Sequence, residues 1–114
     1  MENGDRRRDV RARITLPTYL VRRGANEPVE MLDASYRGLF LRIPDPPQLR
    51  ELVKLRIAIA KNCELELHAV VVRVVGDARG SMGVGLRFFA LNGPERAEWE
   101  GFITNVVRTR ARAA

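Results

Sequence analysis

Short stretches in which hydrophobic and polar residues alternate run through the chain from residue 14 to residue 88. Successive side chains of a β-strand point to opposite faces, so this alternation predicts strands with one buried face and one exposed face. In one example, Lys54 and Arg56 alternate with valine, leucine and isoleucine. We predict six strands, with these inward-facing residues: Ile14, Leu16, Thr18 and Leu20; Val29 and Met31; Leu39, Leu41 and Ile43; Val53, Leu55, Ile57 and Ile59; Leu65, Leu67, Ala69 and Val71; Val84, Leu86 and Phe88.

Residues that favour turns separate these strands. Glycine and asparagine mark turns at residues 24–26 and 61–63, and a glycine-rich turn falls at residues 76–81. The proline-rich run at residues 44–47 ends the third strand, because proline has no N–H to donate to a neighbouring strand. Short turns of this kind predict antiparallel neighbours.

After Phe88 the hydrophobic period changes from two to that of a helix. Asn92 and Glu95 have the spacing of a capping box, which predicts the start of a helix. Four apolar residues then follow at helical spacing: Trp99, Phe102, Ile103 and Val106. The predicted fold is therefore mostly β, a small six-stranded antiparallel β-barrel with a C-terminal α-helix that covers one open end.

The 114 residues are most simply one domain with loose ends. Residues 1–12 are polar and are predicted to form a flexible basic arm, residues 13–108 the barrel with its helix, and residues 109–114 a disordered tail. No apolar run approaches the length needed to span a bilayer, and the first residues lack the apolar stretch of a signal peptide. The single cysteine, Cys63, fits a reducing compartment. We therefore expect a cytoplasmic protein without membrane insertion.

Charge points to an anionic partner. The net charge is +6, and nearly all basic residues are arginines, which favours recognition of phosphate geometry over diffuse attraction. An arginine-rich proteome would give the same bias without any functional cause. Because the positive charge concentrates near both ends while the middle is nearly balanced, discrete sites are favoured.

The first candidate motif is the pair of arginines Arg7 and Arg11, preceded by Arg6. Guanidinium groups clamp phosphates, present donors to O6 and N7 of guanine, and stack on purine rings. An R-x-x-x-R spacing is common in basic sequences, so an arginine-rich terminus without a fixed partner is an alternative interpretation.

The second candidate motif is D-x-S-x-x-G, formed by Asp33, Ser35 and Gly38. Asp33 and Ser35 point to the same side of an extended segment, and Gly38 permits a sharp turn with a positive φ. Asp33 would accept from a guanine N–H edge, and Ser35 would bond to a phosphate or ribose oxygen. The alternative is a serine-stabilised turn that only joins two strands.

Together, and in this order, the two motifs resemble those of the PilZ family, with 21 residues between Arg11 and Asp33. The resemblance continues through Gly38-Leu39-Phe40-Leu41 and Met82-Gly83-Val84-Gly85-Leu86-Arg87-Phe88, and covers about residues 5–107. It implies a PilZ-like barrel and a receptor for the bacterial second messenger cyclic di-GMP. It also implies that the arm wraps the ligand against the barrel, often around two intercalated molecules.

The resemblance also implies the ligand-binding residues: Arg6, Arg7, Arg11, Asp33, Ser35 and Gly38, with Arg8 and Arg37 as additional contacts. Many family members have a second glycine at the position of Arg37. If the backbone there needs a positive φ, Arg37 adds strain; otherwise its side chain offers another phosphate contact. This substitution bears on how many ligand molecules bind.

Enzymatic function is not expected. His68 is the only histidine, no serine has a nearby base, and no set of residues has metal-ligand spacing, so we expect neither a catalytic site nor a metal or other cofactor. The predicted function is a stand-alone cyclic di-GMP receptor that orders its arm on binding and signals to an unidentified effector protein. Two alternatives are a PilZ-like interaction module that has lost its ligand and a nucleic-acid-binding barrel. The few aromatic residues argue against the latter.

Overall fold

The fold consists of six strands and one helix, and the computed structural model describes residues 11–76, 80 and 82–113. The elements are β1 (Thr18–Arg22), β2 (Ala25–Ala34), β3 (Gly38–Arg42), β4 (Leu52–Ala60), β5 (Cys63–Gly76), β6 (Met82–Phe88) and α2 (Gly93–Ala113).

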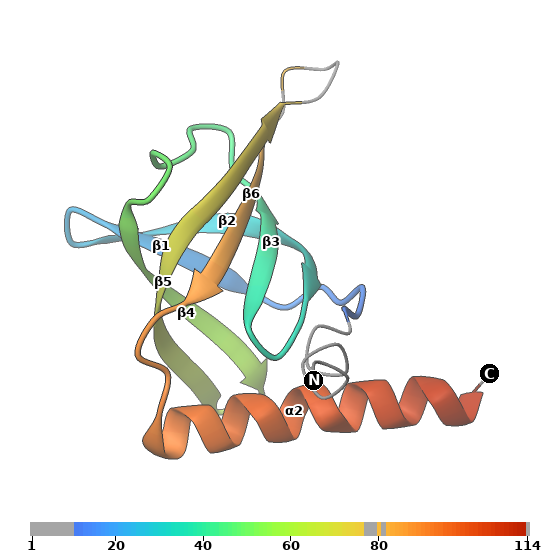
Figure 1. Cartoon of the computed structure of the whole chain (residues 1–114). Helices are drawn as coiled ribbons and strands as arrows, with labels where there is room; N and C mark the ends of the chain where they lie inside the picture. The colour runs from blue at the N-terminus through green and yellow to red at the C-terminus, as the bar shows by residue number, and fades with distance from the viewer. Residues whose placement is uncertain (1–10, 77–79, 81, 114) are drawn as a thin grey trace, which may run out of the picture.

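All six strands pair with antiparallel neighbours and close into a barrel in the order β1-β2-β3-β6-β5-β4 (Figure 1). The barrel closes where β1 pairs with β4, with Leu20 opposite Leu55. Closure removes the open sheet edges that would otherwise expose unpaired backbone groups. The predicted six-stranded antiparallel barrel with a C-terminal helix is confirmed.

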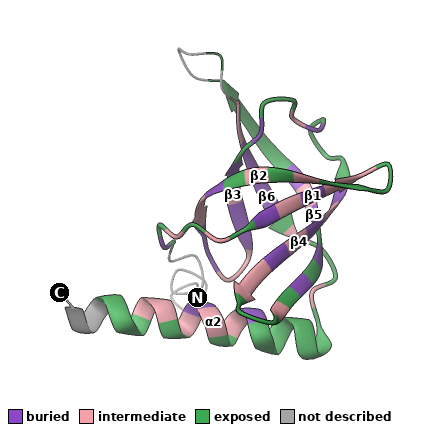
Figure 2. Ribbon diagram, turned by 180° about the vertical axis from the view of Figure 1, so that it is seen from behind, coloured by how far each residue is buried: buried purple, intermediate pink, exposed green. Residues whose placement is uncertain are grey.

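The barrel interior is filled by the residues that the alternation pattern assigned to it. Along β4, Val53, Leu55 and Ile57 are buried, while Lys54 and Arg56, which alternate with them, point outward. Figure 2 shows the resulting alternation of buried and exposed positions along the strands. Burial of one face of each strand fixes the register, because a shift by one residue would turn the apolar set toward water.

Helix α2 crosses one end of the barrel and covers it (Figure 1). Its apolar face buries Trp99 and Ile103 completely. Phe88, the last residue of β6, meets Trp99 edge-to-face with ring centroids 5.2 Å apart. The aromatic residues here are part of the core, as the helical spacing predicted.

The structure differs from the predicted boundaries at both ends. The first strand begins at Thr18 rather than near Ile14, because Pro17 has no N–H to donate to the sheet, although its carbonyl accepts from Ala58. Helix α2 continues to Ala113, where a disordered tail was predicted from residue 109. The added segment contains no glycine or proline and is rich in alanine and arginine, which favour helix. Nothing in the part of the chain that is described forms a helix long and apolar enough to cross a membrane.

Candidate functional site

The two predicted motifs meet on the outside of the barrel. Arg11 Nη1 lies 2.5 Å from Asp33 Oδ1, so the last arginine of the first motif forms an ion pair with the first residue of the second. Both side chains are partly open to solvent, at 49% for Arg11 and 25% for Asp33. Arg6, Arg7 and Arg8, which the sequence also assigned to the site, lie outside the described residues.

A short backbone bridge holds this pair in place. Ala12 N–H donates to the carbonyl of Ala34 at 2.8 Å, and Ala34 N–H donates back to Ala12 at 3.0 Å. Ala12 is buried. The predicted flexible arm included residues 11 and 12, whereas the structure docks these two residues against the end of β2. The two hydrogen bonds form an isolated antiparallel bridge that extends the pairing of β2 by one residue pair.

Ser35 organises the loop between β2 and β3. Its Oγ accepts from the backbone N–H groups of Gly38 at 3.2 Å and Arg37 at 3.3 Å, and its own N–H donates to Gly38 O at 2.9 Å. The residue is only 3% exposed. The serine-stabilised turn, which was the alternative interpretation of this motif, is therefore present in the structure, and the hydroxyl shapes the loop beside Asp33.

Replacing Ser35 with alanine is expected to lower the free energy of unfolding by about 1–3 kcal/mol, because buried N–H groups would lose their acceptor. Urea denaturation of the variant measures the loss. The control is Thr109→Ala, which removes an exposed hydroxyl from α2 and should leave stability within about 0.5 kcal/mol. Unchanged stability combined with weaker nucleotide binding would instead assign the hydroxyl to the ligand.

Gly38 is required for a different reason from the one the sequence suggested. Its φ is not positive, but a Cβ at this position would lie 2.0 Å from the carbonyl oxygen of Leu86 on β6. Glycine therefore permits close approach of β3 to β6. Arg37 does not have a positive φ either, so the backbone strain expected for a non-glycine residue with such a φ is absent.

Helix α2 supports the loop from below. Trp99 Nε1–H donates to Ser35 O at 2.9 Å, and the hydroxyl groups of Tyr36 and Thr104 lie 2.7 Å apart. The sequence assigned Trp99 to the core but gave no role to Tyr36 or Thr104. For Trp99, the sequence did contain one signal of this contact: the indole N–H of a buried tryptophan needs an acceptor. The helix thus fixes the position of the D-x-S-x-x-G loop as well as closing the barrel.

A cavity of about 260 Å³, which we call the motif cavity, lies beside this loop. It is lined by Arg11, Ser35, Arg37, Gly38, Val72, Leu86 and Arg87. The sequence did not single out Val72 or Arg87. Arg87 lies opposite Gly38 in the pairing of β6 with β3, so the strand register brings it to the site. An outward-facing arginine at this position was the only signal in the sequence.

The electrostatics of the motif cavity favour an anion. Three arginines line it, and none of its described lining residues is acidic. Guanidinium groups form strong paired hydrogen bonds with phosphate, and Val72, which is 53% exposed, offers an apolar contact. The cavity is smaller than the roughly 300–1,000 Å³ of typical ligand sites, so a nucleotide bound there would need further cover.

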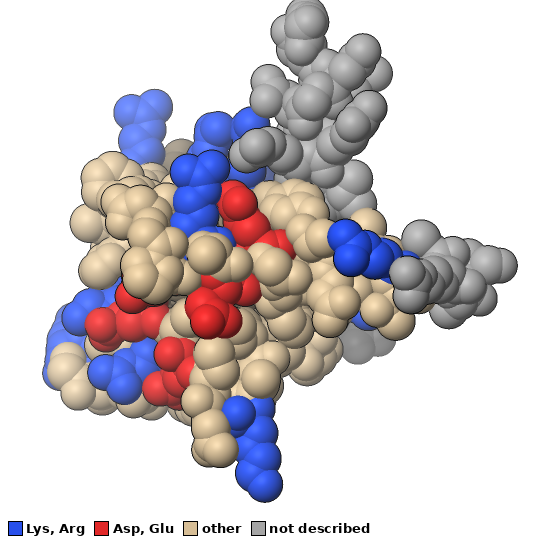
Figure 3. Space-filling model, turned by 90° about the horizontal axis from the view of Figure 1, so that it is seen from below, with Lys and Arg blue, Asp and Glu red and all other residues tan. Residues whose placement is uncertain are grey.

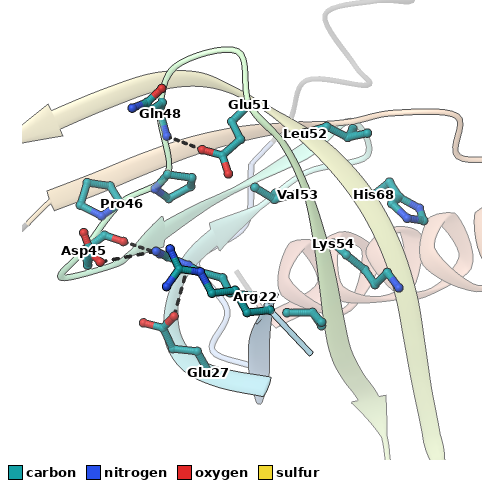
Figure 4. Close-up of a pocket in the computed structure, with 13 residues that line it drawn as sticks. Arg22, Glu27, Asp45, Pro46, Gln48, Glu51, Leu52, Val53, Lys54 and His68 are labelled. Carbon is teal, nitrogen blue, oxygen red and sulfur yellow. Dashed lines mark hydrogen bonds and ion pairs between the residues drawn. The ribbon is translucent and has the colours of Figure 1, made fainter. Parts of the chain in front are cut away.

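A larger cavity of about 720 Å³ lies elsewhere, beside the β1–β2 turn and the proline-rich loop (Figure 4). Its central arginine, Arg22, is already neutralised by Glu27 at 3.3 Å and Asp45 at 3.6 Å. The close-up shows these carboxylates flanking the guanidinium group. This arrangement ties the loop to the β1–β2 hairpin and leaves little net charge for an anionic ligand.

Elsewhere on the barrel, several basic side chains form ion pairs with carboxylates. Lys54 and Arg56 on β4 form ion pairs with Glu66 and Glu64 on β5, at 3.6 and 3.7 Å. Viewed from below, acidic and basic side chains are interspersed on the exposed face (Figure 3). No group of three or more potential metal ligands occurs within the described part of the chain. On this face, the described acidic and basic side chains therefore alternate and do not form one broad basic patch.

Comparison with solved structures finds the same fold in larger proteins. The chain matches K. pneumoniae MrkH in a complex with c-di-GMP (TM-score 0.77, 19% identity, 94% of this chain and 55% of that one). It also matches Bacillus subtilis MotI/DgrA, an inhibitor of motility (0.74, 16%, 90% and 50%). A third match is Escherichia coli YcgR in complex with c-di-GMP (0.73, 11%, 91% and 47%). The chain thus spans about half the length of each of these structures.

At these identities the structural matches establish the fold alone. A search of curated proteins found no match to the sequence. The family model of the PilZ domain, in contrast, matches residues 5–105. Since this match covers most of the chain and includes both motifs, the chain belongs to the PilZ domain family.

Proposed function

We propose that this PilZ domain binds cyclic di-GMP and acts as a receptor for it. The observation that carries the proposal is the junction of the two motifs: Arg11 pairs with Asp33 and lines the arginine-rich motif cavity together with Gly38. The solved structures of MrkH and YcgR, which share the fold, are complexes of those proteins with this ligand. Family membership and local geometry therefore support the same ligand class.

The ligand's chemistry suits these groups. Cyclic di-GMP has two phosphates, which Arg11, Arg37 and Arg87 would contact, and two guanines, whose O6 and N7 accept from guanidinium groups. Asp33 would accept from a guanine N–H edge. Ser35 and Gly38 would contribute by setting the loop, because the hydroxyl of Ser35 already binds two backbone N–H groups.

Arg6, Arg7 and Arg8 are the proposed cover of the site. They precede the docked residues Arg11 and Ala12 by only a few positions in the sequence. Phosphates would neutralise their mutual repulsion and draw this segment over the ligand. Residues 11 and 12 are already docked against β2, so this part of the predicted arm would not need to rearrange on binding.

The output is proposed to be a change of surface that an effector protein recognises in the bacterial cytoplasm, without catalysis by this domain. A receptor that changes shape on binding needs only a difference in affinity between its two conformations.

Titration calorimetry at about physiological salt is expected to show saturable binding of cyclic di-GMP at micromolar or lower concentration, with cyclic di-AMP and GTP binding much more weakly. The reason is that the site would have to contact two phosphates and two guanines at once, and neither control nucleotide offers this combination. Repeating the titration at several salt concentrations separates this from nucleic-acid binding, which would show a steep salt dependence and little preference for one nucleotide. Absence of heat, with an unchanged melting temperature, would favour a module that binds a protein partner without ligand.

A further inference from the structure

A second cavity, which we call the helix-side cavity, adjoins the motif cavity. It has a volume of about 280 Å³ and lies between the D-x-S-x-x-G loop, the end of β6 and the first turns of α2. Arg37 and Arg87 line both cavities. Their backbones are fixed next to each other, because Phe88 N–H donates to Arg37 O at 2.8 Å. The two arginines therefore form a shared wall.

The polar groups of the helix-side cavity include both donors and an acceptor. Arg96 contributes a guanidinium group from α2, and Glu100, one turn later, contributes a carboxylate. Arg96 Nε lies 3.0 Å from Glu100 Oε2, and the two side chains are 49% and 34% exposed. This pair holds a donor and an acceptor side by side at the mouth of the cavity.

Two aromatic rings form its walls. Phe88 is held by its edge-to-face contact with Trp99, and Tyr36 by the 2.7 Å contact of its hydroxyl with Thr104. Aromatic rings held in place in this way offer a flat heterocycle a surface on which to stack.

We propose that the helix-side cavity is a second guanine-binding compartment of the nucleotide site, an inference that rests on the proposed function. A guanine presents O6 and N7 as acceptors, which suits Arg87 and Arg96, and N1–H and N2–H as donors, which suits Glu100. An adenine would present its unprotonated N1 to the carboxylate and lose this match. Each cavity alone is below the typical size of a ligand site, whereas a nucleotide with one base in each cavity would fill a combined volume within that range.

Two sources of this guanine are distinguished by the number of cyclic di-GMP molecules that bind per chain. It belongs either to the same cyclic di-GMP molecule that occupies the motif cavity or to a second molecule stacked on the first. In the first case one molecule binds per chain, and removing the compartment lowers its affinity. In the second case two molecules bind, and removing the compartment lowers the stoichiometry to one.

The test is calorimetric titration of the wild-type protein, Glu100→Gln and Arg96→Gln with cyclic di-GMP and cyclic di-AMP. We expect each variant either to weaken cyclic di-GMP binding about tenfold or to lose one bound molecule, and Glu100→Gln also to narrow the preference over cyclic di-AMP. Matched controls are Glu98→Gln and Arg108→Gln, on the same helix but lining a different cavity, which should bind like wild type.

The outcomes separate this proposal from the receptor function. Wild-type binding by both Glu100→Gln and Arg96→Gln would overturn the compartment and leave the receptor function standing. No binding of cyclic di-GMP by the unmodified chain would overturn both. Because Arg96 and Glu100 form a partly exposed i,i+4 pair, their replacement should change stability little, so folded variants are expected.

Discussion

Replacing Arg11 with alanine is expected to weaken cyclic di-GMP binding by about 2–5 kcal/mol, the range for removing one member of a desolvated charge pair. This corresponds to roughly a 30- to 5,000-fold rise in the dissociation constant, measured by titration calorimetry. The effect is large because Arg11 would serve two roles. It would contact the ligand in the motif cavity, and it positions Asp33 through the 2.5 Å ion pair.

The matched control is Arg42→Ala. Arg42 also forms an ion pair with one carboxylate, Glu30, at 2.7 Å, and its side chain is 44% exposed, close to the 49% of Arg11. It lies at the far end of β3 from Gly38. We expect this variant to bind like wild type. An equal loss in both variants would indicate diffuse electrostatic attraction and remove Arg11 from a specific site.

The Arg11–Asp33 pair also changes the mechanism that the sequence suggested. An arm mobile up to residue 12 would lose conformational freedom along its whole length on binding, at about 1–2 kcal/mol per residue. Because Ala12 is already hydrogen-bonded to Ala34 in the structure, the loss of its conformational freedom occurs on folding and not on binding. The ordering cost of residues 11 and 12 therefore does not have to come from ligand binding.

Much of the fold could be predicted because its pattern is local. Alternation along β4 and β5 and helical spacing from Trp99 to Val106 each depend on burial of one face, which leaves a period in the sequence. Boundaries were harder to predict. Whether Thr109 and the residues after it stay helical depends on helix propensity and contacts of α2, including the Arg110 side chain that donates to Arg13 O, and hydrophobic spacing does not record these.

The site could be predicted only in part. Arg11 and Asp33 were found through their motifs, whereas Arg87 and Val72 reach the motif cavity through strand pairing, which cannot be derived from spacing along the chain. The positive φ suggested for Gly38 was wrong for a similar reason. A glycine required by a positive φ and one required by a neighbouring strand look the same in a sequence, and only the distance to Leu86 separates them.

Gly38→Ala is accordingly expected to destabilise the protein strongly, although it adds only one methyl group. The new Cβ would lie 2.0 Å from the carbonyl oxygen of Leu86, a backbone atom that moves only if β3 and β6 separate. We expect a loss of about 3 kcal/mol or more in the free energy of unfolding, at or beyond the upper part of the range for overpacked cores. Urea denaturation measures this loss, and weaker cyclic di-GMP binding should accompany it because Gly38 lines the motif cavity.

The same substitution in α2 should have the opposite sign. Gly101 lies in the helix, and no neighbouring atom lies within 4 Å of the Cβ that alanine would add, so Gly101→Ala should raise stability by about 0.5–1 kcal/mol through helix propensity. Opposite signs from one chemical change would show that close approach of β3 and β6, rather than glycine content, sets the cost at position 38. If Gly38→Ala instead kept full stability and lost only ligand binding, the glycine would serve approach of the nucleotide to the loop, and the strand-packing explanation would be wrong.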